Sequence, residues 1–323
     1  MKKMLVLVLT AVFFAGINGA LYLSVTRRLK NNFSGANQLH MVDVGRYLPF
    51  EPETDLVRMD VSLHFEEEAD LPVLDGAAAL VPVYASVIEN CYPEGCVTYE
   101  GGVFSDDNYY GENFASDSVM QYQNTVRGFN AVVDGTTDIF FTARPSAEQL
   151  EYADEQGADL NIVPVGREAF VFFVNSNNPV DGLTCDQIRG IYRNEITNWN
   201  EVGGDDRMIN PVTRVEGSGS QTMMEYFMEG DMLTRRNPLS LFGGGIGYSF
   251  RYYLTDLVGN ADVKMLEVDG VYPDSQSIRD GSYPLTTDFY VVYRRDNDNP
   301  NVETLVLWLT GEEGQELIYT VYG

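Results

Sequence analysis

From Leu71 onwards, short apolar runs alternate with stretches of helical periodicity, and this alternation predicts the secondary structure. Strands are expected at LPVLDG, TDIFFT, NIVPV, EAFVFFVN, INPVTR, GIGYSF, VKMLEVDG and FYVVYRR. Helices are expected at AAALVPVYASVIEN, at the stretch ending in GFNAVVDG, and at SAEQLEYADEQ, TCDQIRGIYR, GSGSQTMMEYFM and NVETLVLWLTGEEGQELIYTVY. Strands that alternate with helices are typical of an α/β fold, in which we expect largely parallel sheets.

The amino-terminal pattern is different, because a largely apolar run extends over 22 residues from Met4 to Val25. A helix of that length spans roughly 33 Å, enough for a hydrocarbon core of ~30 Å. The run lacks a good small-x-small cleavage site, since Asn18 is poorly suited to the position before Gly19-Ala20. We therefore expect residues 1–30 to be an uncleaved signal-anchor with the body outside the cell membrane, and a cleaved signal peptide is the alternative.

Residues 31–70 contain NNFSGANQ, PFEPE and EEEAD and show little periodicity, which predicts a tether between the anchor and the folded body.

The net charge excludes one class of partner. The chain has 21 Lys+Arg and 48 Asp+Glu, a net charge of −27. Residues 1–30 hold five of the cations and no acid, so residues 31–323 carry 16 − 48 = −32. Such a surface repels a phosphodiester backbone, and nucleic-acid binding is not expected.

The three cysteines allow two interpretations. Cys91 and Cys96 are close enough in sequence to close a small turn as a disulfide, and two free thiols are equally compatible with the spacing. Cys185 is expected to be a small buried residue in a helix. No histidine lies near the pair, so we expect no metal site there, and the sequence predicts no cofactor.

The segment INPVTRVEGSGSQTMMEYFM contains the candidate site. A β-branched strand ends near Arg214, a Gly/Ser loop follows, and a helix begins near Ser218 or Gly219, so free backbone N–H groups and the helix dipole converge on one point. Hydroxyl donors come from Ser218, Ser220 and Thr222, and Arg214 can meet an oxyanion bidentately. Glu216 can pair with Arg214 and hold it in place. The alternative is that these serines only cap the helix.

The stretch from Arg214 to Ser220 resembles the phosphate-contacting loop of the phosphate-binding proteins that serve ABC importers. LPVLDGAAALVPVY, VDGTTDIFFTARPS and the region from Gly166 to Gly204 also resemble that family, as do GIGYSF and LVLWLTGEEGQELI. The resemblance implies two α/β lobes joined by crossing strands, with the ligand in the cleft between them. Carried onto this chain, lobe one is 71–167 plus 283–323 and lobe two is 168–282.

The resemblance also implies a ligand set and partners. Backbone donors are expected at Ala78 and Ala79, and hydroxyl donors at Thr125 and Thr142, although each threonine can equally be a capping or strand residue. The expected partners are a small anion, the two permease subunits of an ABC importer and its ATPase, and a monomer is expected.

Two departures from the family pattern affect specificity. The hydroxyl residues that usually follow Asp75-Gly76 are replaced by Ala77, Ala78 and Ala79, and an acidic acceptor two residues before Pro145 is replaced by Ala143. The resemblance thus predicts a receptor for phosphate or a related oxyanion. An anchored sensor or interaction module of the same fold that has lost or changed its ligand is the alternative.

Catalysis is not expected. A nucleophilic Ser218 needs a base within reach, and the two histidines of the chain, His40 and His64, lie in the predicted tether.

Overall fold

The computed structural model describes residues 42–322, except 67–69, 105–109, 215, 232, 234–243 and 259–262. The predicted signal-anchor therefore lies outside the described residues, as does the first part of the predicted tether. Within the part that is described, no helix is both long and apolar enough to cross a bilayer. Residues Asp43–Gly323 form one compact unit.

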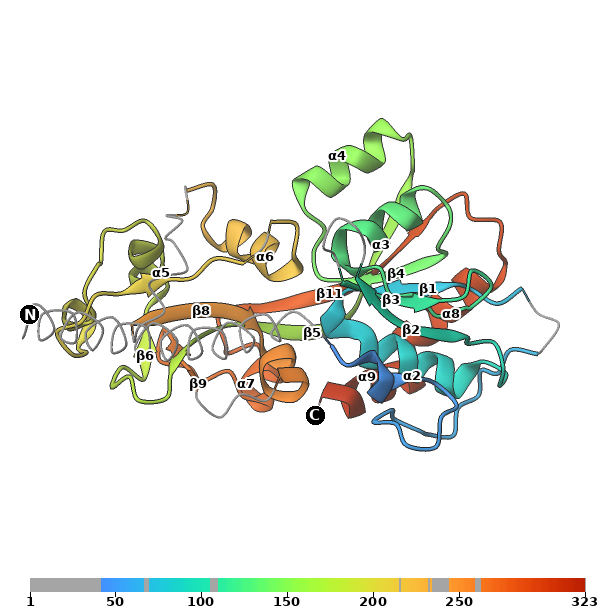
Figure 1. Ribbon diagram of the computed structural model, residues 1–323, viewed down its shortest axis with the longest axis horizontal. Helices are drawn as coiled ribbons and strands as arrows, with labels where there is room; N and C mark the ends of the chain where they lie inside the picture. The colour runs from blue at the N-terminus through green and yellow to red at the C-terminus, as the bar shows by residue number, and fades with distance from the viewer. Residues whose placement is uncertain are drawn as a thin grey trace, which may run out of the picture. The chain divides into compact units, whose positions relative to one another are not determined.

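A mixed sheet of seven strands is the backbone of this unit (Figure 1). Six strands follow the order β1-β4-β11-β5-β8-β7, and β9 pairs with β5 beside that path. Their bounds are β1 Leu74–Gly76, β4 Ile139–Thr142, β5 Leu160–Asn175, β7 Asn210–Pro211, β8 Gly245–Phe250, β9 Val263–Met265 and β11 Thr286–Arg294. Two small two-stranded sheets are separate: β2 Tyr99–Phe104 with β3 Tyr110–Phe114, and β6 Gly182–Leu183 with β10 Glu267–Val268.

The expectation of largely parallel sheets is wrong for the main sheet. The β1–β4 and β7–β8 pairs are parallel, but β11 pairs antiparallel with both β4 and β5, and β5 pairs antiparallel with β8 and β9. The reason is that two long strands, β5 and β11, run through the sheet in opposite directions. Each of them pairs with other strands along both of its edges.

The strand β5 joins the two ends of the sheet. Its residues from Leu160 to Ala169 pair with β11, and its residues from Phe170 to Val174 pair with β8. The runs NIVPV and EAFVFFVN, expected as two strands, are thus one strand of 16 residues. Extended backbone continues through Gly166 and Arg167 because β11 supplies hydrogen-bond partners on that side.

The helices fall into two groups with separate buried clusters. The elements of the first group, called lobe one below, are η2 Ala78–Leu80, α2 Val81–Cys91, α3 Asn124–Val133, α4 Ala147–Glu155, α8 Asn301–Thr310 and α9 Glu312–Tyr322, with β1 and β4. Those of the second group, lobe two, are α5 Cys185–Tyr192, η3 Trp199–Val202, α6 Gly219–Phe227, the π-helical η5 Tyr253–Val258 and α7 Ser275–Asp280, with β7, β8 and β9. Phe129, Phe140 and Val292 belong to one cluster, and Phe172, Met224 and Tyr248 belong to the other.

The carboxyl-terminal stretch expected as a single helix forms α8 and α9. The two helices are separated at Gly311, and a Cβ on Gly314 would lie only 2.4 Å from the Trp308 carbonyl oxygen. The second helix therefore turns back closely onto the end of the first, which requires glycine at that contact.

Residues 42–66, part of the predicted tether, pack along lobe one instead of standing free. A short 3₁₀ turn, η1 Val44–Tyr47, buries Val44 and Tyr47. The Phe65 N–H donates to the Cys91 carbonyl, and Asn90 exchanges two hydrogen bonds with the chain at Val57 and Met59. The segment is mostly polar and has few buried apolar residues, so its sequence does not indicate that it packs on lobe one. The folded body therefore begins earlier than the sequence predicts.

All three cysteines are free thiols, so the structure contains no disulfide between Cys91 and Cys96. Burial raises the pKa of the Cys91 thiol to about 12 and that of Cys96 to about 11. Cys185 is half-buried rather than buried. Burial, followed by a hydrogen bond with Asp269, raises its pKa to about 12.

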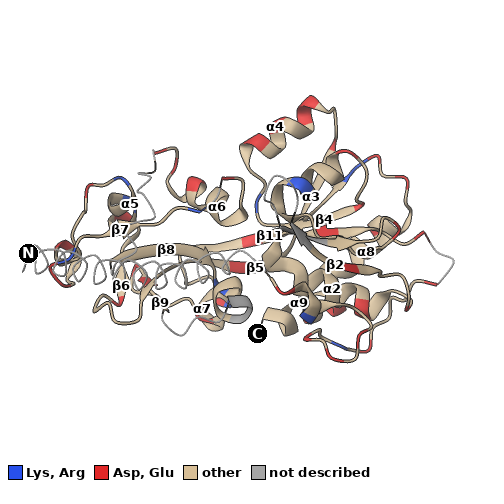
Figure 2. Ribbon diagram, in the orientation of Figure 1, with Lys and Arg blue, Asp and Glu red and all other residues tan. Residues whose placement is uncertain are grey.

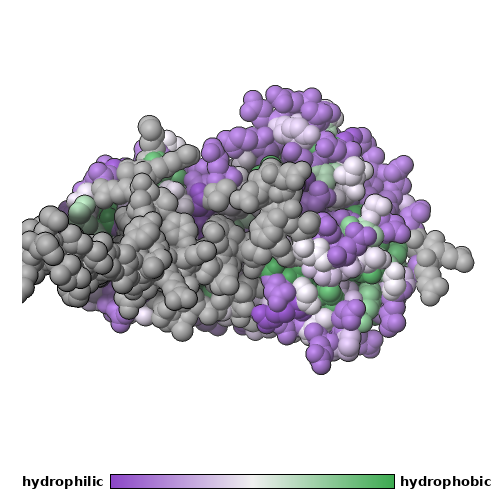
Figure 3. Space-filling view, in the orientation of Figure 1, coloured by the Kyte–Doolittle hydropathy of each residue, from purple (hydrophilic) through white to green (hydrophobic). Residues whose placement is uncertain are grey.

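Acidic side chains are spread over most elements of the described surface, and several are close together on α4 (Figure 2). On the face drawn in Figure 3, the described surface of lobe one is mainly hydrophilic and interrupted by small hydrophobic areas. This surface fits the acidic composition of the chain and shows no broad apolar patch on that part of the face.

Candidate functional site

The helix α6 begins at the Gly/Ser loop, as predicted. Ser218 is the N-cap residue, with φ −74° and ψ 145°, and its Oγ accepts a hydrogen bond from the Gln221 N–H at 3.3 Å. Gly219 and Ser220 follow as the first two helical residues, and Ser220 is buried. Backbone N–H groups in a first helical turn have no partner within the helix, so this end can donate to an anion.

Gln221 fixes the backbone of Arg214 next to this helix start. Its side-chain Oε1 accepts from the Arg214 N–H at 3.2 Å and from the Tyr248 hydroxyl at 2.5 Å. The Tyr248 oxygen also accepts from the same Arg214 N–H, at 3.1 Å. Both Gln221 and Tyr248 are buried, so the backbone of Arg214 is held in place by two side chains from the core of lobe two.

The Arg214 guanidinium is in a desolvated environment. Burial lowers its pKa from the usual arginine value, and the phenols of Tyr253 and Tyr248 raise it in part. The guanidinium carbon lies 6.0 Å from the centre of the Tyr253 ring. Removing a charge from water is unfavourable, so an oxyanion bound at this position would stabilise the arginine as well as be held by it.

Asp75 links three segments of lobe one at one edge of its sheet. Its Oδ1 accepts from the Gly76 N–H at 2.7 Å and from the Gln123 N–H, just before α3, at 3.1 Å. The Ala77 N–H donates to the Phe141 carbonyl of β4. The starts of η2 and α3 and the end of β4 therefore meet at the carboxyl edge of the parallel β1–β4 pair.

The two lobes meet at the start of α6. A Cβ on Gly217, whose φ is +77°, would lie 2.7 Å from Cγ2 of Val126 on α3. A Cβ on Gly219 would lie 3.5 Å from the Phe250 ring and 3.8 Å from Cβ of Ala143, which follows β4. The helix start thus faces the edge of lobe one that Asp75 organises.

The predicted residues fall into three sets in the structure. Arg214, Ser218, Gly219, Ser220 and the buried Thr222 surround the start of α6, with Glu216 exposed beside them. Thr142 ends β4 and is buried, and Thr125 lies in the first turn of α3 beside Val126, so both are at the facing edge of lobe one. Ala78 and Ala79 begin η2 at that edge. The role of each residue toward a ligand, and the pairing of Glu216 with Arg214, stay predictions.

The residues that support the site are not evident from the sequence. Gln221 directly follows the loop from Arg214 to Ser220, and Tyr248 lies in GIGYSF, but neither residue type signals a ligand. Phe250 and Tyr253 are missed for the same reason. Their role depends on β8 lying beside β7, a pairing that joins residues 34 positions apart, such as Arg214 and Tyr248.

A cavity of about 300 Å³ lies elsewhere, at the end of β5 and the start of β8. Asn175, Asn178, Trp199 and Asp205 are among its lining residues, and none of the predicted site residues lines it. Its asparagines are used in local turns, since Asn175 and Asn178 accept from the N–H groups of Asn177 and Val180. Within the described ranges, no cluster of three or more His, Cys, Asp or Glu residues could hold a metal ion.

Comparison with known proteins gives the family. A sequence model described as the PBP superfamily domain matches residues 107–313. The phosphate-binding protein PstS of Bacillus subtilis is 27% identical over 229 residues, which cover 67% of this chain and 73% of that protein. PstS of Borreliella burgdorferi is 22% identical over 212 residues, covering 59% of this chain and 75% of that protein.

Two solved structures share the fold. A candidate phosphate ABC transporter substrate-binding protein from Clostridium perfringens, crystallised with bound phosphate, has a TM-score of 0.57 at 21% identity and covers 77% of this chain and 96% of its own. An ABC-type phosphate transport receptor from Vibrio cholerae has a TM-score of 0.51 at 20% identity and covers 77% and 97%. The two-group α/β architecture and these matches confirm the resemblance found in the sequence, and the chain belongs to the PBP superfamily domain family.

Proposed function

We propose that this protein is an extracytoplasmic receptor that binds inorganic phosphate, or a related oxyanion, between lobe one and lobe two and delivers it to an ABC importer. The observation that carries the proposal is the half-buried Arg214 beside the start of α6, which faces lobe one at Ala143 and Val126. Relatives named as phosphate-binding proteins support the choice of anion.

The site supports binding rather than catalysis. Its hydroxyl groups, at Ser218 and Ser220, have neither a histidine nor a lysine in the contacts described above, and Ser218 Oγ already accepts a helix-capping hydrogen bond. A serine nucleophile needs a base within hydrogen-bond reach. The protein therefore acts by closing its lobes around the anion, and the permease of the importer recognises the closed form.

The sequence suggests the lobe boundaries, the membrane anchoring and the oligomeric state that we propose. The lobes comprise 71–167 plus 283–323 and 168–282, with the crossing near Ala169, where β5 changes partner from β11 to β8. The apolar run from Met4 to Val25 holds the protein at the outer face of the cell membrane as an uncleaved anchor. The receptor works as a monomer.

Calorimetry with inorganic phosphate on the full chain tests the proposal. Arg214→Ala should abolish measurable binding, because removing a charged partner from a desolvated site costs ~2–5 kcal/mol. Ser220→Ala should weaken binding by about tenfold, or ~1.4 kcal/mol. Arg295→Ala is the matched control, since Arg295 is exposed and pairs with Asp159 on the surface. Equal affinity in Arg214→Ala and the wild type would show that the loop is only a helix cap.

A second function, a sensor or interaction module without this ligand, is favoured by one observation. The three residues Ala77–Ala79 provide no hydroxyl groups at the facing edge of lobe one. A thermal-shift panel of phosphate, sulfate, phosphonates and small carboxylates separates the two functions. Stabilisation by none of these anions would favour the sensor. Equal stabilisation by sulfate and phosphate would favour a receptor of low specificity, as expected when Ala143 replaces an acidic acceptor.

A further inference from the structure

The helix α6 has two faces with different neighbours. Met224 and Phe227 are buried in the core cluster of lobe two. Gly219, Met223 and Tyr226 are spaced at i, i+4 and i+7, so they form a second face. Met223 also packs, partly buried, against the core cluster of lobe two, and the face has further contacts outside that cluster.

The second face touches lobe one and the crossing strand. Gly219 faces Ala143 after β4, as described above. The Met223 sulfur accepts from the hydroxyl of Thr287 on β11 at 3.9 Å. The face therefore follows the boundary between the lobes from the anion end of the helix toward its carboxyl end.

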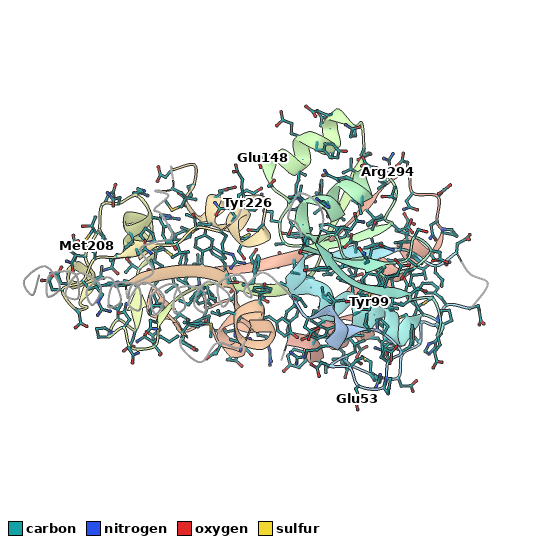
Figure 4. The ribbon with its side chains drawn as sticks, in the orientation of Figure 1. Glu53, Tyr99, Glu148, Met208, Tyr226 and Arg294 are labelled. Atoms are coloured by element: carbon teal, nitrogen blue, oxygen red, sulfur yellow. The ribbon has the colours of Figure 1, made fainter. Side chains whose placement is uncertain are left out.

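Tyr226 makes a shorter hydrogen bond on this face than Met223 does. Its hydroxyl donates to the Pro145 carbonyl oxygen at 2.9 Å, and the Arg144 guanidinium carbon lies 4.6 Å from the centre of its ring. Figure 4 shows Tyr226 projecting from α6 toward α4, where Glu148 is labelled. The side chain is 37% exposed, so it lies at the rim of the boundary and not in a core.

We propose that Tyr226, Arg144 and the Pro145 carbonyl form a clasp that holds the closed arrangement of the lobes and sets how long the anion stays bound. This inference rests on the proposed function and adds positioning residues to it. None of the three groups need touch the anion.

The coupling between clasp and anion follows from the rigidity of α6. Gly219 and Tyr226 are seven residues apart, or about 10 Å along a helix. When an anion draws the start of α6 toward Ala143, the same rigid helix brings Tyr226 to Pro145. Contacts made only in the closed state shift the equilibrium toward closure and lower the dissociation rate, while the association rate depends mainly on the open form.

The alternative is that Arg144 binds the anion directly. Arg144 follows Ala143 in sequence, and its charge also acts on Tyr290 of β11, whose pKa is raised mainly by burial. The two roles differ in what Tyr226 does. A clasp requires the tyrosine hydroxyl, whereas an anion ligand at Arg144 does not.

Stopped-flow kinetics with inorganic phosphate on the full chain test the clasp. Tyr226→Phe should raise the dissociation rate about fivefold, the effect of one lost hydrogen bond, and leave the association rate unchanged. Tyr226→Ala should raise it roughly tenfold to thirtyfold, because the ring contact is lost as well. Arg144→Ala should raise it about twofold to fivefold, and Arg144→Lys should restore part of the loss.

Tyr92→Phe is the matched control. The Tyr92 hydroxyl also donates to a proline carbonyl, that of Pro72, at 3.0 Å, but both residues belong to lobe one. This variant should lower the stability of the fold and leave both phosphate rate constants unchanged. Unchanged dissociation in Tyr226→Phe and Tyr226→Ala would overturn the clasp. A faster dissociation in Arg144→Ala alone would also overturn it and make Arg144 an anion ligand.

A measurement without phosphate keeps this test separate from the proposed function. Hydrogen exchange of the segment 142–149 should be faster in Tyr226→Ala than in the wild type, and its rate in Tyr226→Phe should lie between the two. If the wild type binds no phosphate, the proposed function fails and the exchange decides the clasp alone. Equal exchange in the wild type and Tyr226→Ala would then refute it.

Discussion

At the scale of single residues, Asp75 combines a central position with an unusual environment. Its Oδ1 connects Gly76 with the start of α3, whereas its Oδ2 is buried and has no hydrogen-bond partner among the described residues. Burial raises the pKa of this carboxyl to about 7, and its backbone hydrogen bonds oppose the shift only in part. The residue that organises the facing edge of lobe one is therefore held there at an electrostatic cost near neutral pH.

The pH dependence of stability tests this environment. Between pH 4 and pH 7 the folded chain keeps a proton on Asp75 that the unfolded chain has lost, so the contribution of Asp75 to the free energy of unfolding falls as pH rises and is level above pH 7. Asp75→Asn removes the titration and keeps one acceptor. The free energy of unfolding of the variant minus that of the wild type should therefore increase by roughly 2–3 kcal/mol between pH 5 and pH 8.

Urea unfolding at the two pH values measures this difference. Asp117→Asn, which removes an exposed carboxyl, controls for the loss of one charge. A stability difference for Asp75→Asn that does not change with pH would mean that Asp75 is ionised in the folded protein throughout this range.

Residue types alone predicted the loop at which α6 begins, whereas the ligand roles of its residues stay predictions. The loop from Arg214 to Ser220 was predicted because hydroxyls, glycine and arginine at a strand-to-helix turn are groups that can donate hydrogen bonds to an anion. Gln221, Tyr248 and Tyr226 were not predicted, since their roles come from which elements pack together. The Tyr226 hydroxyl, for example, reaches Pro145 across 81 positions of sequence, a distance that no local pattern encodes.

At the scale of elements, the roles proposed for α6 lie at its two ends, and its first turn can be compared with that of α5. Ser218 caps α6 by accepting from Gln221 N–H at 3.3 Å, and Thr184 caps α5 by accepting from Gln187 N–H at 3.1 Å. The N-cap hydrogen bond is of the same kind in both, and α5 adds a second one, from the Thr184 N–H to the Gln187 side chain at 2.9 Å. One of the two caps faces the proposed anion site.

The two caps should therefore differ in binding and agree in stability. Ser218→Ala and Thr184→Ala should each lower the free energy of unfolding by ~1 kcal/mol, the usual loss for an N-cap hydroxyl. Ser218→Ala alone should also raise the dissociation constant for phosphate. Calorimetry and urea unfolding on both variants measure the two effects. Equal phosphate affinity in both variants would mean that Ser218 caps the helix and has no role in anion binding.

Element boundaries were predicted less well than element types. Apolar periodicity located α2, α3, α4 and α5, but it predicted two strands where β5 is one, and one helix where α8 and α9 are two. In the first case β11 supplies partners along the connecting residues, and in the second Gly314 allows a close contact with Trp308. Both outcomes depend on tertiary contacts that override the local pattern.

At the scale of the whole molecule, the charge is opposite to what an anion receptor would use for attraction. Residues 31–323 carry 16 − 48 = −32, and the described surface shows acidic residues on most elements (Figure 2). Under the proposed function, phosphate, itself an anion, is therefore repelled at long range and bound at short range by Arg214 and the start of α6. The two ranges respond differently to salt, because screening weakens interactions between exposed charges more than those in a desolvated site.

Salt should therefore speed up phosphate binding. The Debye length falls from about 30 Å at 0.01 M to about 8 Å at 0.15 M ionic strength, so the repulsion between phosphate and the acidic surface is largely screened at the higher value. We expect the association rate constant to rise roughly threefold to tenfold over this range in sodium chloride, with a nearly constant dissociation rate constant. The affinity should increase in proportion, and stopped-flow measurements at the two ionic strengths give both constants.

A variant of α4 provides the control for this salt effect. Glu151, Asp154 and Glu155 are exposed on α4, and replacing them by Gln, Asn and Gln removes three negative charges without touching the proposed site. Charges at the rim of a site act mainly on the association rate and its salt dependence, so this variant should bind phosphate faster at 0.01 M and respond less to added salt. An association rate that falls with salt in the wild type would contradict the argument. It would mean that a local positive field around Arg214 reaches beyond the lobes and outweighs the acidic surface.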